Sequence, residues 1–180
     1  MTLGLFCLHQ LLLLRPTTVT EGDLPQNEFH TNGRQPLRIL RKEEDFAKVT
    51  PHMCRDTRPL FHGVVAKICI RSPTEMISGE IAKTGSWDNE LVLLVMKAMF
   101  AYPEATFLDL GSNIGMFTVA VAAMGRKVKA VDAGFENHAY TRTSLQLASN
   151  LHNVDLIYNG LSDKHETLYP YNGGWWLLTL

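Results

Sequence analysis

Two aspartates and three glycines are grouped in the middle of this 180-residue chain, in the stretch FLDLGSNIGMFTVAVAAMGRKVKAVD. An apolar run ends at Asp109, a turn with Gly111, Asn113 and Gly115 follows, and a second apolar run ends at Asp132. Glycines let the backbone approach a ligand closely, and exposed amides at the start of a helix attract an anionic group. A carboxylate at the end of a parallel strand can accept hydrogen bonds from both hydroxyls of a ribose. The stretch therefore predicts a site for a nucleotide-like ligand.

The acid before the first glycine narrows the choice of ligand. The pattern is Asp-x-Gly-x-Asn-x-Gly, whereas dinucleotide sites use G-x-G-x-x-G. A pyrophosphate gains nothing from a nearby carboxylate, but a ligand that carries an ammonium does. S-adenosylmethionine fits this pattern, with its amino group near Asp109, its carboxylate near the turn amides and its ribose near Asp132. A nicotinamide-dependent oxidoreductase is a weaker alternative, and so is a packing turn that binds nothing.

The elements around this turn are predicted in the order strand, helix, strand, helix, strand. Four apolar residues recur on one face of the first helix, and Gly125 can end that helix in a left-handed conformation. A second helix is predicted over about residues 137–151, and VDLIYNG reads as the third strand. This order predicts parallel strands joined by right-handed crossovers, in an α/β fold. The face of the first helix consists of Met116, Val119, Ala120 and Ala123.

Upstream of the turn, the pattern predicts a β-hairpin and then a helix. The strands of the hairpin are expected at residues 64–71 and 76–82, on either side of a Ser-Pro-Thr-Glu turn. Ser86 or Asp88 can cap the following helix, whose apolar residues predict that it is covered on more than one side. A short charged helix is expected over residues 37–49. Residues 52–59 look irregular.

Composition excludes several classes of site. The net charge of -1 gives no reason to expect a nucleic-acid partner. The three cysteines show no C-x-x-C pair, so the spacing predicts neither a zinc site nor a disulfide framework. Cys69 is expected to be a small buried hydrophobe. No metal site is predicted.

Three regions are predicted along the chain: an apolar segment at 1–15, a linker or stem at 16–60, and the α/β domain at 61–180. The apolar run of the first region would span about 18 Å as a helix, short of the roughly 30 Å of a bilayer core. It is therefore expected to be a signal or a short anchor rather than a full transmembrane helix. It allows membrane association or entry into the secretory pathway; otherwise the chain is expected in the cytoplasm.

The central stretch, with ISGEIAKTGSWDNELV before it and NLHNVDLIYNGLSDKHETLYPY after it, resembles the FkbM-type methyltransferases. The resemblance covers about residues 67–171. It implies a partial Rossmann-like sheet of a class I S-adenosylmethionine-dependent methyltransferase, with about three parallel strands. The activity it implies is O-methylation of a small-molecule or glycan-like acceptor.

The resemblance also implies roles for particular residues. Asp132 would bind the ribose, and Asp163 would meet the adenine amino group. Thr84 and Gly85 would belong to a segment that packs over the cofactor, and Trp87 could belong either to that segment or to the core. No catalytic base is identified, because His138 and His165 are expected to be exposed loop histidines. The residues placed around the methionine moiety are Asp109, Gly111, Asn113 and Gly115.

The chain departs from the family after the third strand. The family continues with a fourth strand that carries a K-I-D-x-E-G-x-E-like motif, and this sequence has none. The first strand of the sheet is therefore expected to be a bare edge, and the acceptor-binding half to be missing. This leaves a second hypothesis open: a non-catalytic ligand-binding or interaction domain derived from a methyltransferase fold.

Overall fold

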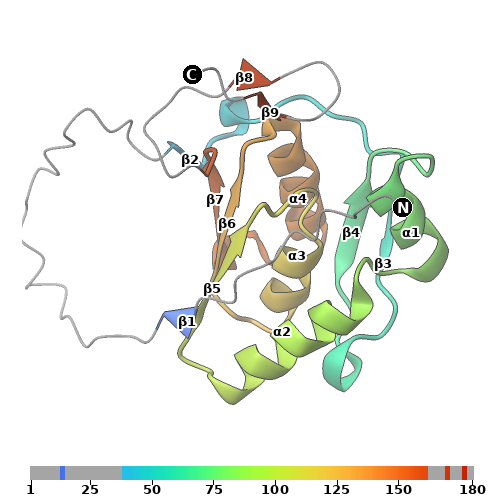
Figure 1. Cartoon of the computed structure of the whole chain (residues 1–180), viewed down its shortest axis with the longest axis vertical. Helices are drawn as coiled ribbons and strands as arrows, with labels where there is room; N and C mark the ends of the chain where they lie inside the picture. The colour runs from blue at the N-terminus through green and yellow to red at the C-terminus, as the bar shows by residue number, and fades with distance from the viewer. Residues whose placement is uncertain (1–12, 15–37, 162–168, 171–175, 178–180) are drawn as a thin grey trace, which may run out of the picture.

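A computed structural model describes residues 13–14, 38–161, 169–170 and 176–177, and the statements below concern those residues. Its main feature is a five-stranded mixed sheet with the strand order β1-β5-β6-β7-β2 (Figure 1). The three central strands are parallel, and each edge strand is antiparallel to its neighbour. The central strands are β5 (Thr106–Leu110), β6 (Val128–Asp132) and β7 (Val154–Tyr158); the edges are β1 (Leu13–Leu14) and β2 (Arg38–Leu40).

Two crossover helices connect the parallel strands, as predicted. Helix α3 (Met116–Ala123) joins β5 to β6, and α4 (Phe135–Leu147) joins β6 to β7. Almost all of α3 is buried, because its small and apolar side chains pack between the sheet and the rest of the core. Gly125 follows with a φ of 73°, in the left-handed conformation expected of a helix stop. Both helices lie between the sheet and a separate two-stranded hairpin (Figure 1).

The hairpin differs from the prediction. Strand β4 (Lys67–Ile70) pairs with β3 (Met53–Asp56), which comes from a stretch expected to be irregular. The segment predicted as the second strand is instead helix α1 (Met76–Thr84). The side chain of Glu75 accepts hydrogen bonds from the first amides of α1, at 3.3 Å and 2.8 Å. Gly85 ends the helix with a φ of 79°.

The prediction of a charged helix over residues 37–49 is also wrong. Residues Arg38–Leu40 form β2, the edge strand that pairs with β7. Only a 3₁₀ turn, η1 (Glu43–Asp45), follows, and the Asp45 carboxylate accepts hydrogen bonds from the amides of Arg41 and Lys42. These bonds to backbone amides lower the pKa of Asp45. Sheet pairing has overridden the local helical pattern here.

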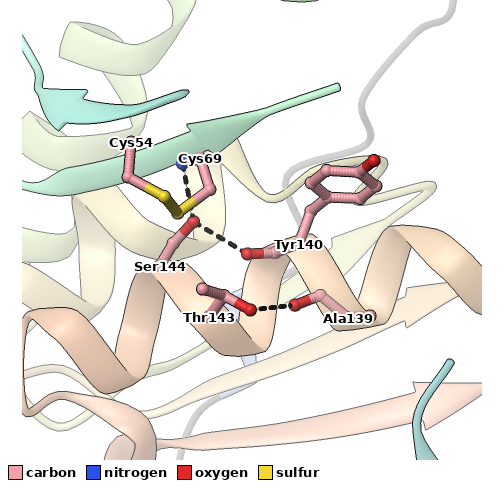
Figure 2. The surroundings of a disulfide bond; sticks show 6 residues. All are labelled: Cys54, Cys69, Ala139, Tyr140, Thr143 and Ser144. Atoms are coloured by element: carbon pink, nitrogen blue, oxygen red, sulfur yellow. Dashed lines mark hydrogen bonds between the residues drawn. A yellow bond between two sulfur atoms is a disulfide. The ribbon is translucent and has the colours of Figure 1, made fainter. Parts of the chain in front are cut away.

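A disulfide joins Cys54 to Cys69, directly opposite each other in the β3–β4 hairpin. The prediction that the cysteines form no disulfide is therefore wrong, although Cys69 is buried as expected. Cys54 is exposed. The amide of Cys69 donates to Ser144 Oγ on α4 at 2.9 Å, and that hydroxyl donates to the Tyr140 carbonyl at 2.8 Å (Figure 2). The hairpin is thus held against α4.

Helix α2 (Asn89–Ala101) begins after Asp88, which occupies the N-cap position but makes no side-chain capping bond. One face of α2 enters the core through Val92, Met96 and Met99. On the opposite face, Leu91 and Leu94 are exposed and not covered by the described part of the chain, whereas the Phe100 ring packs against the rings of Phe61 and His62. The prediction that this helix is covered on more than one side is wrong for that face.

The edges and the tail complete the described structure. Residues Leu13–Leu14 pair with Thr106 and Phe107, so the first parallel strand is not bare over those two residues, contrary to expectation. Strands β8 (Tyr169–Pro170) and β9 (Trp176–Leu177) pair with each other. None of the helices within the described ranges is long and apolar enough to cross a membrane.

Candidate ligand-binding site

The glycine turn connects the end of β5 to the start of α3 and bends sharply toward β6. Gly111, Asn113 and Gly115 have φ values of 79°, 50° and 88°, all in the left-handed region. Glycine adopts this region without strain, and asparagine tolerates it better than most residues do. The sequence pattern of this turn is therefore explained by its backbone.

The two glycines face different surroundings. A Cβ atom on Gly115 would lie 2.6 Å from Thr141 Cγ2 of α4, so the turn and α4 are in close contact there. A Cβ atom on Gly111 would have no atom within 4 Å, and Gly111 is exposed. Gly111 therefore marks the open side of the turn and Gly115 the packed side.

The backbone amides of the turn are already used within the protein. Those of Gly111 and Ser112 both donate to the Val131 carbonyl, at 2.9 Å and 3.1 Å. The Ile114 amide donates to Asn113 Oδ1 at 2.8 Å, and the Gly115 amide donates to the Ser112 carbonyl at 2.9 Å. These bonds fix the turn to β6. They also mean that a ligand carboxylate finds no free amide among these residues, contrary to the expectation from the sequence.

Asp109 lies beneath the turn rather than in an open crevice. Asp109 is 1% exposed, and Thr118 Oγ1 of α3 donates a hydrogen bond to its Oδ2 at 2.6 Å. The side chain occupies the strand end predicted for it, but its carboxylate points into the protein. Its chemical influence on a ligand is therefore electrostatic, through the turn above it.

Asp132 connects the turn to the next helix. Its Oδ2 accepts a hydrogen bond from the Asn113 amide at 2.7 Å. Its Oδ1 accepts from the Gly134 amide at 2.6 Å and from Asn137 Nδ2 at 2.7 Å. The structure thus brings together Asp132 and the turn, as the sequence predicts. It adds Asn137, which the sequence analysis missed because its role depends on where α4 begins.

His138 is fully buried in α4, so the prediction of an exposed loop histidine is wrong. Its Nε2 forms a hydrogen bond with the Asp132 carbonyl at 3.0 Å, and its ring meets the Tyr158 ring edge-on. Burial lowers the pKa of His138, against the opposing effect of its backbone hydrogen bond and of the Asp132 charge. His138 is a neutral supporting residue beneath the site. His165 lies outside the described residues.

The remaining predicted site residues have local structural partners. Thr84 Oγ1 donates to the carbonyls of Glu80 at 3.0 Å and Ser86 at 2.8 Å. A Cβ atom on Gly85 would lie 2.6 Å from the Arg58 amide nitrogen. Only glycine therefore fits at this position, where the end of α1 contacts the backbone of Arg58. These partners lie outside the glycine turn. Trp87 packs against the core, and Asp163 lies outside the described residues.

A cavity of about 710 Å³ lies on the outer face of α4, away from the glycine turn. The Arg142 guanidinium beside it forms an ion pair with Glu43 and lies over the Phe46 ring at 4.6 Å. The charge of Arg142 is therefore already neutralised. No group of three or more potential metal ligands gathers anywhere in the described ranges.

Comparisons of the chain with protein-family models, with curated proteins and with solved structures find no match in any of the three. The described residues define an α/β protein whose mixed sheet contains parallel strands. A functional assignment has to rest on the geometry of the turn.

Proposed function

We propose that this chain binds S-adenosylmethionine at the glycine turn and forms the cofactor-binding part of a methyltransferase that resembles the FkbM type. The observation that carries the proposal is one turn flanked by two strand-end carboxylates, Asp109 and Asp132, with Gly111 open beside them. The order β5-α3-β6-α4-β7 supports a Rossmann-like arrangement, in which ligands bind at the carboxyl ends of the strands.

The charge at this turn favours a cationic ligand. All three donors to Asp132 are neutral N–H groups. The negative potential of the Asp132 carboxylate therefore favours a sulfonium and an ammonium over a pyrophosphate. Gly111 would face the methionine moiety and Asp132 the ribose, while Asn113 and Gly115 would shape the turn around them.

S-adenosylmethionine supplies a methyl group on a sulfonium, whose transfer requires mainly that the acceptor oxygen be aligned with it. We propose O-methylation of a small-molecule or glycan-like acceptor. An oxygen acceptor often also needs a general base. His138 is buried and bonded to the Asp132 carbonyl, so it is not available to an acceptor. This observation favours the second candidate function, a domain that binds the ligand without turnover.

Two alanine variants at matched glycines test the ligand. Gly111 and Gly63 have φ values of 79° and 74°, and a Cβ atom on either would have no atom within 4 Å. Both variants should therefore lose similar stability. Isothermal titration with S-adenosylmethionine should show unchanged binding for Gly63→Ala and at least about tenfold weaker binding for Gly111→Ala. The proposal is wrong if the unsubstituted chain does not bind, or if both variants bind equally well.

A second measurement separates the two candidate functions. The chain is incubated with S-adenosylmethionine and oxygen acceptors such as short glycans, and S-adenosylhomocysteine is quantified. Turnover would exclude the binding-only function, whereas binding without turnover would favour it. A parallel titration with NAD(H) should show no binding, since the turn lacks the G-x-G-x-x-G pattern.

A further inference from the structure

Asp132 has fewer free acceptor positions than a ribose diol requires. A carboxylate offers about four lone-pair positions, two on each oxygen. Oδ1 already accepts two hydrogen bonds, from the Gly134 amide and from Asn137 Nδ2, and Oδ2 accepts one from the Asn113 amide. About one position therefore remains, on Oδ2. A ribose presents two hydroxyl donors, so one of them needs another acceptor.

The side-chain oxygen of Asn137 is such an acceptor. A carboxylate only accepts, so the atom of Asn137 that faces Asp132 must be the NH₂ group, which makes the other atom the oxygen. Asn137 is 8% exposed, and its Oδ1 accepts no hydrogen bond from the described part of the chain. A buried acceptor without a donor is costly, and its presence points to a donor that a ligand supplies.

Gly134 allows the backbone to lie in close contact with the Asp132 carboxylate and the Asn137 amide. Its φ of -84° is one that any residue can adopt, so backbone conformation does not explain a glycine here. A Cβ atom on Gly134 would lie 2.6 Å from Asn137 Nδ2 and 2.9 Å from Asp132 Oδ1. A side chain would therefore crowd the two groups. Asn137 Oδ1 is shielded from solvent in this structure, so a ligand hydroxyl reaches it only if the loop at Gly134 moves aside.

We propose that Asn137 is a ligand-contacting residue and that a ribose diol is bound by two different groups, the Asp132 carboxylate and the Asn137 amide oxygen. Each group accepts one hydroxyl. This inference rests on the proposed function, because it assumes that the ligand at the glycine turn carries a ribose. It differs from binding of both hydroxyls by the carboxylate alone.

The test compares ligands that lack one hydroxyl. S-adenosylhomocysteine and its 2′-deoxy and 3′-deoxy forms are titrated into the full chain and into Asn137→Ala. The unsubstituted chain should bind each deoxy form about five- to tenfold more weakly than the parent ligand. Asn137→Ala should lose that discrimination for one hydroxyl and keep it for the other. The quantity compared is the ratio of the dissociation constants of each deoxy form and the parent ligand. A general weakening of binding through Asp132 affects all three ligands alike and cancels in this ratio.

Two further variants complete the design. Glu136→Ala changes an exposed neighbour on the same helix and should leave both ratios unchanged. If Asn137→Ala does not fold, Asn137→Ser serves instead. This substitution also removes the amide oxygen, and it leaves a small polar side chain at the position. Circular-dichroism melts establish that each variant is folded.

The outcomes distinguish the two levels of inference. If the unsubstituted chain binds neither S-adenosylmethionine nor S-adenosylhomocysteine, the proposed function is wrong and this inference falls with it. If the ligands bind with the expected dependence on Gly111, but Asn137→Ala weakens all three by the same factor, then Asn137 only supports Asp132. In that case this inference is wrong and the proposed function stands.

Discussion

The left-handed glycines at residues 111 and 115 share a backbone conformation but serve different needs. Gly111 keeps a surface open, whereas Gly115 allows α4 to approach the turn. A side chain at either position carries the strain of a positive φ, about 1–2 kcal/mol. Only at Gly115 would the new methyl also collide with a neighbour, Thr141.

We therefore predict that Gly115→Ala lowers the free energy of unfolding by about 2–5 kcal/mol, the sum of backbone strain and overpacking. Gly63→Ala has a similar φ and open space around it, and should cost about 1–2 kcal/mol. Urea unfolding followed by circular dichroism measures both. Equal losses of unfolding free energy in the two variants would show that Thr141 can move away from the new methyl group. The conclusion that Gly115 is tightly packed would then be wrong.

The sequence predicts the turn itself well and its surroundings poorly. Gly111, Asn113 and Gly115 follow from local backbone rules, which a sequence pattern carries directly. The donors to Asp132 and the burial of His138 depend on the start and the rotation of α4. The pattern placed that helix start two residues too late, at residue 137 rather than Phe135. Such tertiary contacts are not encoded in spacing alone.

At the scale of elements, α1 shows how a short apolar pattern misleads. The segment MISGEIA was read as a strand, yet Ile77 and Ile81 also lie four residues apart, as in a helix. The capping bonds of Glu75 and the left-handed Gly85 decide between the two readings. Gly79 in the middle of α1 is explained by contact, because a Cβ atom there would lie 2.5 Å from the Pro73 carbonyl oxygen.

The β3–β4 hairpin is closed by the disulfide between Cys54 and Cys69. The two cysteines are 15 residues apart, and closing a loop of that length stabilises a protein by about 3 kcal/mol in the chain-entropy account. We predict that Cys54→Ala lowers the free energy of unfolding by about 2–4 kcal/mol. Cys54 is the site to change because it is exposed, whereas Cys69 is buried against α4. Urea unfolding under non-reducing conditions measures the loss.

Reduction supplies the control for this prediction. Dithiothreitol should destabilise the unsubstituted chain by a similar amount and leave Cys54→Ala unchanged. If dithiothreitol destabilises both proteins equally, the effect does not come from the Cys54–Cys69 bond. Disulfides persist mainly in oxidising compartments. In protein isolated from such a compartment, we also expect that an alkylating reagent modifies neither Cys54 nor Cys69.

At the scale of the whole molecule, the buried His138 makes stability depend on pH. Its pKa is lowered by burial in the folded state, so the unfolded chain binds a proton that the folded chain does not. Stability is therefore retained above the unfolded pKa of about 6.5 and falls as the pH drops below it. The groups that face the ring are the Asp132 carbonyl and carboxylate, the Tyr158 ring and the backbone of Ile157. We predict a loss of about 1 kcal/mol between pH 7.5 and pH 5.5.

Urea unfolding at the two pH values, both above the range in which carboxylates usually titrate, measures this loss. His138→Gln should reduce the difference between the two pH values. His152→Gln removes an exposed histidine and should leave it unchanged. A pH dependence that survives in His138→Gln would show that another group is responsible.

The central part of the fold was predictable and its edges were not. Strands β5, β6 and β7 follow from apolar runs that end at acids or turns, and their parallel pairing follows from the helices between them. The edge strands β1 and β2 are two and three residues long, too short for a pattern to mark them. They are also antiparallel to the strands that they cover.

The pairing of these edge strands has a consequence for the order in which the chain folds. Leu13 pairs with Phe107 and Arg38 with Tyr158, so each contact joins residues roughly 90 to 120 positions apart. During synthesis, which proceeds from the N-terminus, β1 and β2 emerge first but have no partner until β5 and β7 follow. Strand β2 thus cannot pair until β7, the last strand of the parallel set, has been made, and contacts of such long separation form slowly.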